Sequence, residues 1–171
     1  MKTLILGGAR SGKSRLAQDL AGRSGLAVMY LATATAGDDE MRQRIAQHRR
    51  ERPDHWTTLE APIELDRCMR EHAAAKRCLL VDCLTLWLNN QLCAGHDPAA
   101  ACANLVETVR HLPGEIILVS NELGLGVVPM GELTRRFVDE AGRLHQMLAQ
   151  TCDRVVLTVA GLPLVIKGDP L

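Results

Sequence analysis

Residues 4–16 read LILGGARSGKSRL, a short apolar run followed by a glycine-rich stretch that ends in Gly12-Lys13-Ser14. The stretch matches the pattern G-x-x-x-x-G-K-[ST] of a phosphate-binding loop. Glycines allow the backbone to turn its N–H groups toward phosphate oxygens, and the positive end of the following helix adds to the attraction. We therefore expect a nucleoside triphosphate to be bound by Gly7, Gly8, Ala9, Arg10, Ser11, Gly12, Lys13 and Ser14.

Two residues of this loop carry chemistry as well as binding. Lys13 can reach the β- and γ-phosphates, and the Ser14 hydroxyl can ligate Mg²⁺. Such a loop needs a carboxylate on the metal side at the end of a neighbouring strand, and Asp82 follows the apolar stretch RCLLV. We expect Ser14 and Asp82 to hold Mg²⁺, with capping of the next helix as the alternative role of Asp82.

The rest of the chain alternates apolar strand-like segments with helical patterns. Strands are expected at 2–6, 26–32, 77–82, 115–119 and 154–159, and helices at 13–22, 38–51, 63–75, 84–93, 98–110 and 130–150. This alternation predicts an α/β fold, a mostly parallel sheet with helices on both faces, in a single domain over residues 1–171. The stretch 155–168, VVLTVAGLPLVIKG, predicts a strand, a Gly-Leu-Pro turn and a returning strand, which would form a hairpin at one edge of the sheet.

Composition excludes several classes of partner. The formal net charge is zero and only four residues are Trp, Tyr or Phe, so neither broad electrostatic binding of nucleic acid or membranes nor base stacking is expected. No apolar run approaches the ~20 residues of a membrane span, and no leader precedes the first strand. The six cysteines form no CxxC pair, so we expect buried thiols in a cytoplasmic protein rather than zinc ligands or disulfides.

A histidine among arginines suggests a nucleophile. Met41, Ile45 and His48 are spaced to share one face of the helix expected at 38–51, and the arginines around that face are Arg42, Arg44, Arg49, Arg50 and Arg52. A neutral imidazole held near a phosphate chain can attack it. A solvated polar histidine is the alternative that the residues alone leave open.

Other polar and aromatic residues receive simpler interpretations. Glu122 follows the strand expected at 115–119 and either faces the ligand crevice or stabilises a loop. Trp56 and Trp87 are expected in the core. The remaining histidines are expected in polar, exposed surroundings: His55, His72, His96, His111 and His145.

A series of motifs runs in order along residues 3 to 168 and resembles one enzyme family. The motifs are GGARSGKSR, YLATA, DDEM, RI..H…RP..W.T.E, LLVDCLT.W..N, SNE.G.G.VP and R.F.D..GR..Q.LA. Together they resemble the bifunctional adenosylcobinamide kinase / adenosylcobinamide-phosphate guanylyltransferase of cobalamin biosynthesis. Phosphate loops are common, so the resemblance depends mainly on the DDEM-to-W block and on SNE.G.G.VP.

The resemblance implies a P-loop, RecA-like fold, a homotrimer and two reactions. The enzyme phosphorylates adenosylcobinamide with ATP or GTP, and then transfers GMP from GTP to that phosphate with release of pyrophosphate. The second reaction passes through a GMP-histidine intermediate, which the motif places on His48. The further nucleotide contacts that the resemblance implies are Thr33, Ala34, Thr35, Arg49, Arg50, Glu51, Arg52, Glu60 and Asp82.

Two other functions remain compatible with the residues. A P-loop kinase or NTPase without nucleotidyl transfer would not need His48. A regulatory module that senses GTP would bind nucleotide without turnover, but a sensor has no use for a nucleophile.

Overall fold

The computed structural model describes residues 1–171 apart from Asp38 and Glu51, and the side chains of Met41 and Arg44 are also outside the described part. The strands are β1 (Lys2–Gly7), β2 (Ala27–Ala32), β3 (Thr57–Glu60), β4 (Arg77–Asp82), β5 (Glu115–Asn121), β6 (Arg154–Val159) and β7 (Leu162–Lys167). The helices are α1 (Lys13–Arg23), α2 (Asp39–Arg50), α3 (Leu65–His72), α4 (Leu84–Cys93), α5 (Pro98–His111) and α6 (Glu132–Thr151).

The strands form one sheet in the order β3-β2-β4-β5-β1-β6-β7. All neighbouring strands run parallel except β6 and β7, which are antiparallel. The central strands β4, β5 and β1 are short, apolar and largely buried, as expected where helices cover both faces of a parallel sheet. The predicted mostly parallel sheet is confirmed.

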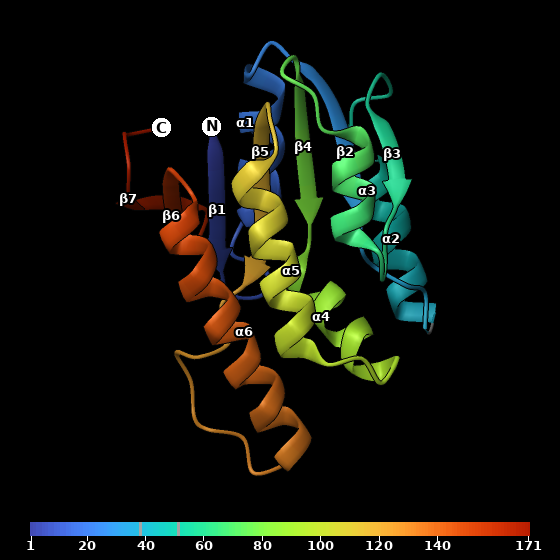
Figure 1. Ribbon diagram of the computed structural model, residues 1–171, viewed down its shortest axis with the longest axis vertical. Helices are drawn as coiled ribbons and strands as arrows, with labels where there is room; N and C mark the ends of the chain where they lie inside the picture. The colour runs from blue at the N-terminus through green and yellow to red at the C-terminus, as the bar shows by residue number, and fades with distance from the viewer. Residues whose placement is uncertain (38, 51) are drawn as a thin grey trace.

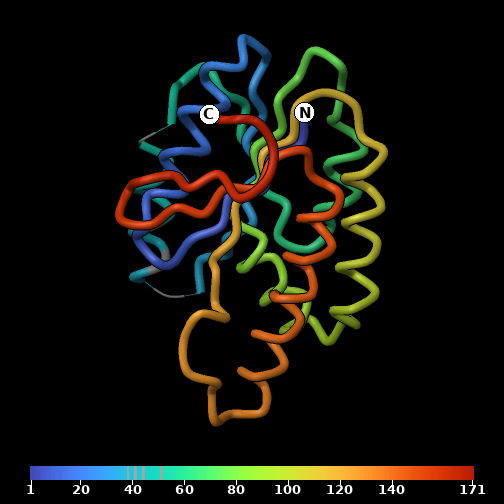
Figure 2. Tube along the Cα trace, turned by 90° about the vertical axis from the view of Figure 1, so that its left-hand side faces the viewer, coloured from blue at the N-terminus to red at the C-terminus, as the bar shows by residue number. Residues whose placement is uncertain are grey.

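Helices cover both faces of this sheet, and two hydrophobic clusters lie between the layers. Figure 1 shows α3, α4, α5 and α6 in front of the sheet and α1 behind it, and Figure 2 shows the same layers from the side. Leu65, Trp87, Leu105 and Leu144 of the front helices pack in the larger cluster. Ala17 and Ala21 of α1 pack in the smaller cluster, together with Trp56 and strand residues.

Most element boundaries agree with the sequence expectations to within three residues. The start of α5 is a clear case, because the Asp97 side chain accepts a hydrogen bond from Ala99 N at 3.0 Å and Pro98 occupies the first helical position. Both tryptophans are in the core, since Trp56 is 8% and Trp87 2% exposed. None of the helices in the described part of the chain combines the length and apolarity that a membrane crossing requires.

The sequence analysis missed β3. This strand has only four residues, pairs with β2 alone at the edge of the sheet, and is mostly exposed. An edge strand without an apolar run gives no strong sequence signal, because its stability comes from hydrogen bonds to β2 rather than from burial.

The predicted edge hairpin is confirmed, but its predicted Gly-Leu-Pro turn is wrong. The turn consists of Ala160 and Gly161, whose φ angles are 51° and 81°, and Leu162 and Pro163 already belong to β7. Two successive residues with positive φ form the tight turn that matches the twist of two antiparallel strands. Pro163 is tolerated because β7 is the last strand of the sheet.

Candidate functional site

The phosphate-loop sequence connects β1 to α1 in the geometry that the motif predicts. Gly12 has a φ of 93°, in the left-handed region, and immediately precedes Lys13, the first residue of α1. The Lys13 ammonium group donates a hydrogen bond to the Gly8 carbonyl oxygen at 3.0 Å. The loop therefore curls around the start of α1, where backbone N–H groups and the helix dipole favour an anion.

The C-terminal hairpin supports this loop. Gly161 N donates to the Ser11 carbonyl oxygen at 2.8 Å, and a Cβ placed on Gly12 would lie 3.1 Å from Gly161 Cα. Figure 2 shows the hairpin in red beside the N-terminal segment in blue. The positive φ of Gly12, together with this tight approach, favours a residue without a side chain at position 12.

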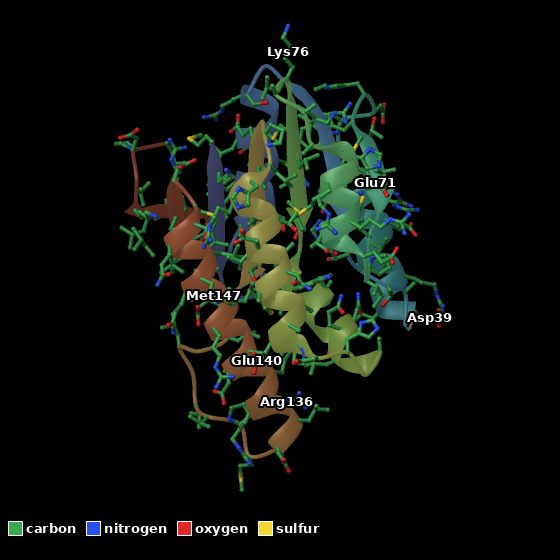
Figure 3. All side chains as sticks on the ribbon, viewed as in Figure 1. Asp39, Glu71, Lys76, Arg136, Glu140 and Met147 are labelled. Atoms are coloured by element: carbon green, nitrogen blue, oxygen red, sulfur yellow. The ribbon has the colours of Figure 1, made fainter. Side chains whose placement is uncertain are left out.

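A cavity of about 730 Å³ opens next to the loop, at the carboxyl ends of the central strands. Figure 3 helps to locate this end of the sheet, since the labelled Lys76 lies at the amino end of β4 and the labelled Asp39, at the start of α2, lies toward the opposite end. The cavity brings together these predicted site residues: Lys13, Ser14, Ala34, Thr35, His48, Arg49, Arg52, Glu60 and Asp82. Ligands of open α/β sheets bind at this edge, so the location favours a nucleotide.

Other predicted site residues lie elsewhere. Gly7 to Gly12 do not line the cavity, and Arg50 is exposed at the end of α2 without lining it. Glu51 lies outside the described residues. Thr33 is fully buried. The binding roles of these residues stay predictions.

Tyr30 is a site residue that the sequence analysis did not identify. Its hydroxyl donates to Asp82 Oδ2 at 3.1 Å, and the Arg52 guanidinium lies 3.5 Å from the centre of its ring. Burial, together with the nearby Asp82 carboxylate, raises the pKa of Tyr30, so the phenol stays protonated and donates. Tyr30 therefore fixes the orientation of Asp82 and supports Arg52 from one side.

Two further groups define the chemistry of the cavity wall. Arg49 and Glu60 form an ion pair at 2.5 Å, but both side chains are more than half exposed, so the pair can open at little cost to contact a ligand. Burial, with a smaller effect of Asp82, raises the pKa of the Cys83 thiol to about 11. Cys83 is therefore a neutral thiol near pH 7 and a poor nucleophile compared with an imidazole.

Thr33 has a structural role that explains its burial. Its hydroxyl donates to the Cys83 carbonyl oxygen at 2.7 Å and accepts from Cys83 N at 2.8 Å, so it joins the carboxyl ends of β2 and β4. Its own carbonyl oxygen accepts from the Asn90 side chain at 2.8 Å. These bonds hold Asp82, the neighbour of Cys83, at the cavity.

Thr33→Val should lower the free energy of unfolding by about 1–2 kcal/mol, because the buried N–H of Cys83 loses its acceptor, while the Cys83 carbonyl oxygen keeps Trp87 N as a donor. The midpoint of urea denaturation measures this effect. Thr57→Val is the matched control, since Thr57 is exposed on β3. Equal midpoints for the two variants would contradict the structural role of Thr33.

The expectation that His145 is exposed is wrong. His145 is only 7% exposed, because α6 presents it to the sheet beside Ser120, and burial lowers its pKa. Its position in a helix with many polar residues gave no sign of this. Of the cysteines, Cys78, Cys83, Cys102 and Cys152 are buried, whereas Cys93 is exposed.

The hard-oxygen groups in the cavity fit a Mg²⁺ ion that arrives with a nucleotide. Ser14 and Asp82 both line it, and Tyr30 bonds only Oδ2 of Asp82, which leaves Oδ1 for a cation. Within the described residues there is no group of three His, Cys, Asp or Glu side chains that could hold a metal. A magnesium ion shared between two protein oxygens and substrate phosphates needs no such group.

Comparisons with known proteins identify relatives of the whole chain. The family model described as cobinamide kinase / cobinamide phosphate guanyltransferase matches residues 3–166. The chain is 63% identical to the bifunctional adenosylcobalamin biosynthesis protein CobP of Pseudomonas aeruginosa over 174 residues, which cover 100% of both chains. It is 38% identical to the bifunctional adenosylcobalamin biosynthesis protein CobU of Escherichia coli over 182 residues, which cover 98% of this chain and 100% of that one.

Solved structures show the fold alone. The RadB recombinase aligns with a TM-score of 0.50 and 15% identity, over 91% of this chain and 73% of the recombinase. A protein from Pyrococcus horikoshii OT3 aligns with a TM-score of 0.56 and 12% identity, over 99% and 87% of the two chains. The predicted P-loop, RecA-like α/β fold is confirmed.

Proposed function

The chain belongs to the cobinamide kinase / cobinamide phosphate guanyltransferase family, and from this membership we propose that it phosphorylates adenosylcobinamide and then guanylylates the product through His48. The chain is thus an enzyme of adenosylcobalamin biosynthesis with two transferase reactions. The proposal concerns the substrates and the residues that carry each reaction.

In the kinase reaction, the phosphate loop holds ATP or GTP with its γ-phosphate toward the corrinoid. The aminopropanol hydroxyl oxygen of adenosylcobinamide attacks the γ-phosphorus, and the bond to the β-phosphate bridging oxygen breaks. The nucleoside diphosphate leaves, and the hydroxyl proton is released. Lys13 stabilises the negative charge that develops on the β- and γ-phosphate oxygens.

In the guanylyl transfer, an imidazole nitrogen of His48 attacks the α-phosphorus of GTP. The bond between the α-phosphorus and the β-phosphate oxygen breaks, and pyrophosphate leaves. The phosphate oxygen of adenosylcobinamide phosphate then attacks the same phosphorus, which breaks the N–P bond and regenerates His48. Arg49 and Arg52 are proposed to bind the phosphate oxygens during both steps.

Other groups hold the nucleotide in the proposed complex. The backbone of the loop from Gly7 to Ser14 binds the phosphates, Glu60 accepts hydrogen bonds from guanine or ribose, and the Thr33–Thr35 segment and Arg50 are further contacts. Ser14 and Asp82 would hold Mg²⁺, which would supply positive charge to the phosphate chain. A homotrimeric assembly, which the family resemblance implies, and a cytoplasmic location are further parts of the proposal.

One observation carries this proposal. His48 on α2 and the Lys13-Ser14 pair at the start of α1 line the same cavity, although they are far apart in the sequence. A kinase that used only the phosphate loop would not need a histidine on the opposite wall. The arrangement supports a nucleophile that faces the phosphate chain of a bound nucleotide.

The test is to incubate the purified protein with Mg²⁺ and GTP labelled at the α-phosphate, and in parallel with GTP labelled at the γ-phosphate. We expect only the α-label on the denatured protein, in a bond that is labile to acid and stable to alkali, as in a phosphoramidate. Nucleotide binding without α-label would leave a P-loop kinase without guanylyl transfer. Added adenosylcobinamide phosphate should remove the label from the protein.

A further inference from the structure

Asn121 lines the nucleotide cavity on the side of the phosphate loop, and the sequence analysis assigned it no role. It is the last residue of β5, the strand that lies between β1 and β4. In the register of the sheet it pairs with Gly7, the first residue of the phosphate loop. Among the described residues, none bonds its side-chain amide, so the amide is available to a ligand.

The backbone of Asn121 is fixed from behind by a chain of buried hydroxyl groups. Asn121 N donates to Thr85 Oγ1 at 2.7 Å, and Thr85 Oγ1 lies 3.1 Å from Ser120 Oγ. Ser120 Oγ in turn lies 2.8 Å from Nε2 of His145. Thr85, Ser120 and His145 are each 7% exposed or less, so water does not compete for these bonds. The chain connects α4, β5 and α6 behind one cavity residue.

The contact between Glu122 and His145 favours one of the two proton arrangements that this chain allows. Burial lowers the pKa of His145, so its ring is neutral and carries a single N–H. Glu122 Oε2 lies 3.8 Å from Nδ1, which favours the proton on that nitrogen and leaves Nε2 as an acceptor. Ser120 therefore donates to His145, Thr85 donates to Ser120, and Asn121 N donates to Thr85. Each hydroxyl both donates and accepts, so the chain is satisfied and rigid.

We propose that the side-chain amide of Asn121 donates a hydrogen bond to the terminal phosphate of the bound nucleoside triphosphate, and that Thr85, Ser120 and His145 position it. Asn121 is a binding residue in this proposal, and the other three are positioning residues. The proposal rests on the proposed function only in taking the bound nucleotide to be GTP.

The register of the sheet favours the terminal phosphate, rather than the base or the ribose, as the part of the nucleotide that Asn121 contacts. Asn121 is next to Gly7 on the sheet, and the cavity wall that it shares with Lys13, Ser14 and Asp82 is the wall with the groups for the β- and γ-phosphates and Mg²⁺. Glu60 comes from β3, which β4 and β2 separate from β5, and His48 and Arg49 come from α2, which precedes β3. These residues are therefore on the part of the cavity away from Asn121. A neutral amide donor between the lysine and the carboxylate suits a phosphate oxygen.

The test compares two guanine nucleotides whose α,β-bridging oxygen is a methylene group, so that His48 cannot cleave them. Calorimetry gives the Kd of α,β-methylene GTP and of α,β-methylene GDP for each variant. Asn121→Ala should weaken triphosphate binding by about tenfold or more and leave diphosphate binding unchanged, because a hydrogen bond to a charged group is lost only with the former. Asn104→Ala on the exposed surface of α5 is the matched control.

The positioning role of Thr85, Ser120 and His145 is tested by the ratio of the Kd for α,β-methylene GDP to the Kd for α,β-methylene GTP. His145→Leu removes the acceptor for Ser120 and should reduce the preference for the triphosphate, whereas His145→Gln should restore most of it, since the amide oxygen can accept in place of Nε2. An equal loss for both nucleotides in Asn121→Ala, or no loss, overturns the proposal. If the wild-type protein binds neither nucleotide, the proposed function fails as well. If His48 is guanylylated but the Asn121→Ala variant still prefers the triphosphate over the diphosphate as the wild-type protein does, only the present inference is overturned.

Discussion

Alanine in place of His48 should abolish covalent labelling of the protein by α-labelled GTP and slow guanylyl transfer by at least about a thousandfold, because the nucleophile is removed. Phosphorylation of adenosylcobinamide should remain measurable, since the γ-phosphate is bound by the phosphate loop on the other wall of the cavity. The variant therefore separates the two reactions.

The measurement follows both products of the His48→Ala variant in one reaction mixture that contains GTP and adenosylcobinamide. Adenosylcobinamide phosphate should accumulate and no adenosylcobinamide-GDP should form. His111→Ala is the matched control, because His111 is exposed on α5, far from the cavity lining, and its Nε2 lies 2.7 Å from Glu107 Oε1. Normal formation of adenosylcobinamide-GDP by the His48 variant would remove this residue from the mechanism.

Lys13→Ala should instead slow both reactions together, each by about a hundredfold or more. The ammonium group is the charged donor of the loop, and it is placed to stabilise the leaving diphosphate in the kinase step and pyrophosphate in the guanylyl step. Loss of one such preorganised donor typically costs two to three orders of magnitude in kcat. The rate of each reaction at saturating GTP measures the effect.

The control for Lys13→Ala is Lys76→Ala, because Lys76 lies at the amino end of β4, opposite to the cavity (Figure 3). This variant should have the rates of the unchanged protein. A Lys13 variant that lost only one reaction would show that the two reactions use separate phosphate sites. The pair of variants, one selective and one general, therefore tests whether a single cavity serves both reactions.

Much of the fold could be predicted from the sequence because its strands are buried runs of apolar residues. The strand before the loop, the strand that ends at Asp82 and the strand from Glu115 are all of this kind, and each is bounded by polar or turn residues. The edge elements were harder to predict. β3 is exposed and short, and the hairpin turn depends on two positive φ angles, one of them at Ala160, which is an unusual residue for such a conformation.

The site residues also fall into a group that could be predicted from the sequence and a group that could not. A motif with a fixed spacing identifies Lys13 and Ser14, and an apolar strand that ends in a carboxylate identifies Asp82, although β5 separates that strand from β1. Tyr30, Asn121 and His145 have no motif, and their importance comes from contacts between elements that are distant in the sequence. Such contacts depend on the register of the sheet and on the face that a helix turns inward, and a single sequence gives neither with certainty.

The contact between Gly161 and Ser11 joins the last strands of the chain to its first loop. During synthesis the phosphate loop emerges well before the hairpin that braces it, because the two are far apart in the sequence. Until the hairpin has been synthesised, the loop lacks the hydrogen bond from Gly161. A chain that ends at Val159 carries the entire G-x-x-x-x-G-K-S motif but lacks this brace, so the support of the loop depends on residues far outside the motif.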